Sequence, residues 1–195
     1  MRILVIGGTG TIGREIVAAL APRHEVISAS RRGEVRVDVE DPASVRSLLA
    51  RIGPLDAVVS AAGALAFRPL AALGDDDFAL GLRSKLMGQV NVARAAVEHL
   101  RDGGSITLTS GVLARHPAPG SASAALCSSA IEGFVRAAAL ELPRGIRINA
   151  VSPPWVRETL AAMGLDPAPG KPAAEVARAY VASIEGLASG TSIDA

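Results

Sequence analysis

The sequence has few aromatic residues and almost no cysteine. Phe, Tyr and Trp together make up 3% of the 195 residues, and Cys127 is the only cysteine. A lone cysteine excludes an internal disulfide, which favours a reducing compartment. No apolar run approaches the roughly 20 residues of a membrane span. The apolar opening stretch Ile3–Ile6 breaks at Gly7, too early for a secretory signal. These absences predict a cytoplasmic protein that has no membrane partner.

The sequence also lacks a concentration of charge. Its net charge is +1, and basic and acidic residues are interspersed. A nucleic-acid binder needs a concentrated basic patch, so no nucleic-acid partner is expected. No group of His, Cys and carboxylate residues has metal-ligand spacing, and neither a P-loop nor a nucleophile elbow occurs. We therefore expect no metal site.

Alternating short β-branched runs and longer helical patterns predict an α/β fold. Hydrophobic residues make up 49% of the chain, and its length suits one domain, residues 1–195. The alternation is typical of βαβ units around a Rossmann-type, doubly wound parallel sheet. The expected strands are Arg2–Ile6, Glu25–Ala29, Val35–Val37, Ala57–Ser60, Ser105–Thr109 and Arg147–Val151, with Thr191–Ala195 as a further edge strand. The expected helices are Ile12–Ala21, Pro42–Ile52, Asp75–Leu100, Ala122–Leu140 and Ala173–Glu185.

One connection is too short for a helix. Only five residues separate Ala29 from Val35, whereas a parallel crossover takes about a dozen or more. The helix after the second strand is therefore missing, and the third strand should be short, irregular or at the sheet edge. The Pro- and Gly-rich stretch Gly164–Pro172 is either a lid or an ordinary surface loop.

A glycine-rich turn follows the first strand directly. It contains GxGxxG at Gly8, Gly10 and Gly13 and opens the first expected helix. Residues without a β-carbon permit such a turn and let the backbone approach a diphosphate at the helix N-terminus. This context indicates a dinucleotide-binding turn rather than an empty one. The cofactor contacts predicted here are Gly7, Thr9, Gly10, Thr11, Ile12 and Gly13.

The end of the second expected strand indicates which dinucleotide binds. NAD-specific sites usually carry an acidic residue there to hold the ribose hydroxyls, but this strand ends in Ser30, Arg31 and Arg32. Guanidinium groups offer paired donors to a phosphate. We therefore predict NADP(H) rather than NAD(H), with these three residues at the 2′-phosphate. The alternative is a solvated basic loop.

Four further stretches carry a family resemblance. They are Asp38-Val39, Ser60-Ala61-Ala62-Gly63, Ile131–Leu142 and Arg144–Pro153. In this order they resemble the short-chain dehydrogenase/reductase family. The resemblance implies that Asp38 and Val39 cradle the adenine and that the loop at Pro153 touches the nicotinamide. It also implies that Ala61, Ala62 and Gly63 line the cofactor site.

The chain departs from this family at its catalytic residues. Relatives use Asn, Ser, Tyr and Lys, with the tyrosine as proton donor or acceptor. These four positions fall on Lys85, Gly111, Ala124 and Ser128. No Tyr-x-x-x-Lys exists anywhere, because Tyr180 is the only tyrosine and the only other lysine is Lys171. The chain resembles a subgroup in which the typical active-site residues are absent.

Few groups remain to perform chemistry. We single out two catalytic candidates: Lys85, whose pKa would fall if it were desolvated, and Ser110, which could hydrogen-bond a substrate oxygen. Each also has an ordinary structural explanation, as a surface lysine and a strand-end polar cap. His116 is expected to be a loop bystander. Trp155 either stacks on the cofactor or substrate or packs the loop.

Three functions therefore stay open. The first is an NADP(H)-dependent oxidoreductase with a rebuilt active site and an unidentified small-molecule substrate. The second is a non-catalytic NADP(H) sensor or partner protein, and the third is an isomerase or cyclase that reuses the pocket. An apolar stripe at Leu86, Val90, Ala93 and Val97 faces either the sheet or a second copy. The family resemblance implies a homodimer or homotetramer.

Overall fold

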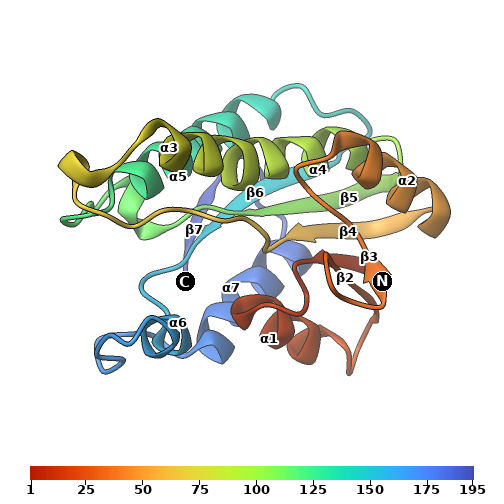
Figure 1. Cartoon of the computed structure of the whole chain (residues 1–195). Helices are drawn as coiled ribbons and strands as arrows, with labels where there is room; N and C mark the ends of the chain where they lie inside the picture. Colours follow the sequence, from red (N-terminus) through yellow and green to blue (C-terminus); the bar gives the residue numbers. More distant parts are fainter.

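Seven parallel strands form one sheet at the centre of the molecule (Figure 1). The computed structural model describes residues 1–195. The strands are β1 (Arg2–Ile6), β2 (Glu25–Ser30), β3 (Val35–Arg36), β4 (Leu55–Ser60), β5 (Leu100–Thr109), β6 (Arg147–Ser152) and β7 (Ser192–Asp194). Their order is β3-β2-β1-β4-β5-β6-β7, and every neighbouring pair is parallel. The predicted doubly wound Rossmann-type sheet is confirmed.

Helices cover both faces of this sheet. They are α1 (Thr11–Leu20), α2 (Pro42–Ile52), α3 (Asp75–Gly81), α4 (Gly88–Ala96), α5 (Ala122–Ala138), α6 (Arg157–Ala162) and α7 (Ala173–Glu185). Short helical turns occur at η1 (Leu70–Ala72), η2 (Leu82–Met87) and η3 (Val112–Ala114). In Figure 1, α1 and α7 lie on one side of the sheet, and α3, α4 and α5 lie on the other.

Alternation along the strands divides the core into two layers. Ile3 and Val5 of β1 pack with α1 and α7 in one apolar cluster. Leu4 and Ile6, which point to the other face, pack with α2, α4 and α5 in a second cluster. Burial on both faces explains why β1 is hydrophobic at every position after its first.

The missing helix is confirmed. The chain passes from β2 to β3 through Arg31–Glu34, and β3 is a two-residue strand at the sheet edge. It pairs through Ala29 with Val35 and Ser30 with Arg36. The short connection therefore leaves the tip of β2 bordered by a loop.

The helix expected over Asp75–Leu100 is wrong in its extent. Its central part is the wide turn η2, regular helix ends at Ala96, and Leu100 already begins β5. Leu100 pairs with Leu55 in the sheet. An apolar residue can continue a helical stripe or start a buried strand, and here strand pairing prevails. The short helix α6 was not predicted.

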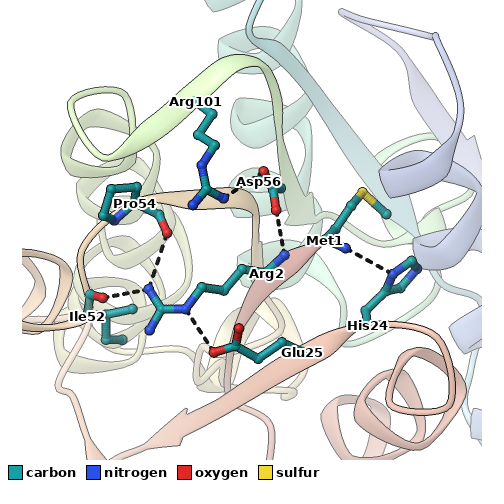
Figure 2. A network of polar contacts seen from close by, with 8 residues as sticks. All are labelled: Met1, Arg2, His24, Glu25, Ile52, Pro54, Asp56 and Arg101. Carbon is teal, nitrogen blue, oxygen red and sulfur yellow. Dashed lines mark hydrogen bonds and ion pairs between the residues drawn. The ribbon is translucent and has the colours of Figure 1, made fainter.

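A polar network joins four strands at the edge of the sheet where β1 begins (Figure 2). The Arg2 guanidinium donates to the Ile52 carbonyl at 2.6 Å and to Glu25 at 2.9 Å. The Arg2 backbone N–H donates to Asp56 at 2.6 Å, and Asp56 also accepts from Arg101 at 2.8 Å. These contacts link β1, β2, β4 and β5 at the amino-terminal ends of the strands. The glycine-rich turn lies at the opposite, carboxyl-terminal ends.

None of the helices combines the length and apolar character that a membrane-spanning segment requires.

Candidate active site

The glycine-rich turn between β1 and α1 is packed too closely for side chains at its glycine positions. Gly7 has a φ of +85°, and a β-carbon there would lie 2.8 Å from the Ala61 carbonyl carbon. A β-carbon at Gly13 would lie 2.0 Å from the Gly7 oxygen. Gly10 precedes α1 without a side-chain cap. The first N–H groups of this ten-residue helix therefore have no side-chain partner, an arrangement suited to an anion.

A groove of about 380 Å³ runs from this turn across the tips of β2 and β4. Its lining includes these predicted cofactor residues: Gly7, Thr9, Gly10, Ser30, Arg31, Arg32, Asp38, Val39, Ala61, Ala62 and Gly63. Ile12 and Pro153 line the neighbouring pocket instead. Gly13 is buried beneath the turn, and Thr11 begins α1. The structure thus gathers most of the predicted cofactor residues along one groove, and their contacts with a cofactor stay predictions.

Four further residues, which the sequence did not predict, also line the groove: Ile6, Val37, Glu40 and Ser84. Ser84 accepts a hydrogen bond from the Ala64 backbone N–H at 3.1 Å. Glu40 pairs with Arg83 at 2.6 Å, and that hydrogen bond holds the pKa of the Glu40 carboxyl below its usual value. In the sequence, the only indication that Glu40 lines the groove was its position two residues after Asp38.

The tip of β2 holds an unsatisfied polar atom. Ser30 is 9% exposed, and its Oγ has no hydrogen-bond partner. Arg31 and Arg32 follow it on the exposed loop and line the same groove. A buried hydroxyl without a partner costs about 1–3 kcal/mol. A phosphate bound here would satisfy the hydroxyl and both guanidinium groups, so these residues fit the 2′-phosphate of NADP(H).

A second pocket, of about 210 Å³, lies beside the groove at the ends of β5 and β6. Its lining includes all four positions at which the sequence resemblance predicts catalytic residues: Lys85, Gly111, Ala124 and Ser128. Phe67 and Trp155 also line it, with their ring centroids 5.3 Å apart. Trp155 therefore packs against another ring and faces the pocket at the same time. These four positions therefore lie around one cavity.

Lys85 contributes an ammonium group to this second pocket. It lies in the wide turn η2, is 8% exposed, and has no hydrogen bond or ion pair at Nζ. A β-carbon at Gly63 would lie 2.9 Å from Lys85 Cδ, so that glycine makes room for the lysine stem. Burial lowers the pKa of Lys85 to about 8. The pocket therefore contains a cation that gives up its proton near neutral pH.

Ser110 lines the same pocket but directs its proton away from it. Its single Oγ–H donates to Glu132 Oε1 at 3.0 Å, and the Ser128 carbonyl oxygen, 3.2 Å from the same Oγ, is the alternative acceptor. Glu132 is itself buried and lies 3.7 Å from Arg115. Because its proton is already engaged, Ser110 offers only lone pairs to a ligand. The sequence reasoning missed Glu132 as its partner, because 22 residues separate the two positions.

The remaining candidates lie elsewhere. His116 does not line either cavity. Tyr180 is fully buried on α7, where its hydroxyl contacts Thr109 Oγ1 at 2.7 Å and burial raises its pKa. Cys127 is buried on α5, and burial raises the pKa of its thiol. None of the three lines the groove or the second pocket.

Comparisons with known proteins agree on one family. A family model described as enoyl-(acyl carrier protein) reductase matches residues 9–183. The chain is 31% identical to hydroxynaphthalene reductase arp2 of Aspergillus fumigatus over 182 residues, which are 80% of this chain and 67% of that one. It superposes on the protein lin1944 from Listeria innocua with a TM-score of 0.93 and 38% identity, over 100% and 98% of the chains. A small-chain dehydrogenase in complex with NADPH matches with a TM-score of 0.88 and 29% identity, over 100% and 96%.

The buried Lys85 ammonium should reduce stability. Its pKa falls from 10.5 to about 8 on folding, so folding below pH 8 forces an unpaired charge out of water. The gap between these values corresponds to at most about 3.5 kcal/mol. This cost disappears as pH rises from about 8 to 10.5, where the lysine becomes neutral in both states. Lys85→Met should therefore raise the free energy of unfolding in urea at pH 7, and the gain should shrink by pH 10.

Lys171→Met is the matched control, because Lys171 is the only other lysine and lines neither cavity. It should not raise stability. A Lys85→Met protein that is less stable than the wild type at pH 7 would contradict the buried, unpaired state of Lys85.

Proposed function

The chain belongs to the short-chain dehydrogenase/reductase family, and we propose that it is an NADP(H)-dependent oxidoreductase with a non-standard active site. One observation carries the proposal: the groove and the second pocket adjoin. Gly63 lines the groove and lies against the stem of Lys85, which lines the pocket. A dinucleotide along the groove would thus end beside a cavity that contains an ionisable group.

The chain's own residues suit each part of NADP(H). The N–H groups at the start of α1 bind the diphosphate, and Ser30, Arg31 and Arg32 bind the 2′-phosphate. Asp38 and Val39 border the adenine end of the groove. When bound, NADPH supplies a hydride. The NADPH complex of a relative that is 29% identical supports this choice of cofactor.

The second pocket holds and protonates the substrate. Lys85, in its ammonium form, donates a proton to the substrate oxygen that gains negative charge. Ser110, oriented by Glu132, accepts a hydrogen bond from a substrate hydroxyl. Phe67 and Trp155 exclude water from the outer side of the pocket. These residues thus provide the proton donation and substrate hydrogen bonding that the tyrosine and its neighbours provide in relatives.

Arg31→Ala should weaken NADPH binding and leave NADH binding unchanged. A hydrogen bond to a charged group is worth about 1.5–3 kcal/mol, which corresponds to a loss of about 10- to 150-fold. Fluorescence titration of both nucleotides measures the effect. Arg46→Ala is the control, since Arg46 is exposed on α2 and lies outside the groove. Equal losses for NADPH and NADH would argue against a 2′-phosphate contact.

NADPH oxidation with a panel of carbonyl compounds tests catalysis. With Lys85 as the acid, kcat/KM for reduction should be constant below about pH 8 and fall above it, because the ammonium is lost there. Lys85→Met should abolish this dependence and lower turnover by about 10²–10⁴-fold, while NADPH binding is retained. NADPH binding without any turnover across the panel would instead favour a sensor or partner protein.

We also propose that the protein forms a homodimer or homotetramer through α4 and α5. Leu86, Ala93 and Val97 of the expected apolar stripe pack onto the core. Beside them an open groove of about 380 Å³ separates the two helices, with Phe134 and Leu142 on its α5 side. A second copy of the chain would cover this apolar groove.

Phe134→Glu should therefore shift sedimentation velocity profiles towards the monomer, because it places a charge in the apolar groove. Arg136→Glu, two residues further along α5 and exposed, changes charge without entering that groove. A wild-type protein that sediments as a monomer at micromolar concentration would contradict the proposal.

A further inference from the structure

The second pocket contains one charged residue and nothing to neutralise it. Among its lining residues only Lys85 bears a charge, and the others are apolar side chains, glycine and hydroxyl residues. Lys85 is 8% exposed, and its Nζ has neither a hydrogen bond nor an ion pair. The lysine side chain is therefore largely desolvated and its charge is unpaired within the chain, a state that an anion in the pocket would stabilise.

No group of the surrounding elements supplies that charge. The one titratable group whose charge affects the pKa of Lys85 is Cys127 on α5, and burial raises the pKa of that thiol, so it is neutral at pH 7. The carboxylates of the neighbouring elements are engaged elsewhere or exposed. Asp77 pairs with Arg68, Glu40 with Arg83 and Glu132 with Arg115, whereas Asp75 and Asp76 lie in solvent at the start of α3. Glu158 on α6 accepts a hydrogen bond from the Ala173 backbone N–H, and Asp38 accepts one from the Glu40 backbone N–H. The α4 segment carries no acidic residue. Any anion that pairs with Lys85 must therefore come from outside the chain.

The size of the pocket limits what that anion can be. An apolar cavity of about 150 Å³ accommodates benzene, and this pocket measures about 210 Å³. Its walls include the Phe67 and Trp155 rings, which favour a flat apolar frame. The space therefore suits one ring that carries one small charged group.

We propose that this pocket is a binding site for small organic anions, in which a carboxylate on a single-ring frame pairs with the Lys85 ammonium. A carboxylate oxygen resembles the substrate oxygen that gains negative charge during hydride addition, so such acids also compete with the carbonyl substrate. That competition rests on the proposed function, whereas the binding itself requires only the pocket and Lys85. Small carboxylic acids are then natural inhibitors of this site.

Trp155 provides a direct readout of binding, because it is the only tryptophan and it lines the pocket. Its fluorescence is titrated with benzoate and with benzamide, which has the same shape but no charge, and calorimetry repeats each titration. At pH 7 benzoate should bind at least about tenfold more tightly than benzamide, as expected for a charge-assisted contact. Lys85→Met should remove this preference and leave the affinity for benzamide unchanged. Lys171→Met should retain the preference.

The pH dependence gives an independent check. Benzoate stabilises the ammonium, so the pKa of Lys85 rises in the complex, and affinity is fully present below the free value of about 8. Above it affinity falls, by about tenfold at pH 9 relative to pH 7, because free Lys85 is then mostly neutral. Benzamide affinity should not change over this range.

Three results would overturn the inference: equal affinities for benzoate and benzamide, a benzoate preference that survives in a folded Lys85→Met protein, or no binding of either by fluorescence and calorimetry. NADPH titration of the same samples separates the two proposals. NADPH binding without a benzoate preference refutes only this inference. A Lys85-dependent benzoate preference without NADPH binding refutes only the proposed function.

Discussion

The close approach of two backbone segments at the end of β1 is the constraint on which the candidate site depends. Gly7 and Gly13 let the turn pack against Ala61 and against itself at distances that a β-carbon would prevent. This contact brings the start of α1 next to the end of β4, and the groove runs between them. Gly63, in the loop that follows β4, has no side chain and so leaves room for the Lys85 side chain. Glycine thus defines both the groove and the neighbouring pocket.

The second pocket combines one lysine with small residues. Gly111, Ala124 and Ser128 are small and line the same cavity as Lys85. The cation that faces this cavity lies in a wide helical turn, a feature frequently found at functional sites. Its charge has no partner within the chain, and we expect this to reduce stability, a cost often found at functional sites.

Much of the fold could be predicted because local chemistry marks its boundaries. Helix α2 begins with Asp41 as its cap and Pro42 at its first turn, and it ends at Gly53, so its limits follow from sequence alone. No such marker separates α4 from β5, and the prediction ran through the turn to Leu100. The groove residues were foreseeable because they follow strand ends. The Ser110–Glu132 contact was not, since it joins a strand to a helix through tertiary packing alone.

The missing crossover helix has a consequence for solubility. It makes β3 a two-residue strand, and at the other edge of the sheet β7 has only three residues. Unpaired N–H and C=O groups on a long edge strand recruit further chains and promote aggregation. Edges this short offer almost no template for such pairing. The short connection that leaves the tip of β2 bordered by a loop therefore also helps to prevent the sheets of two molecules from pairing.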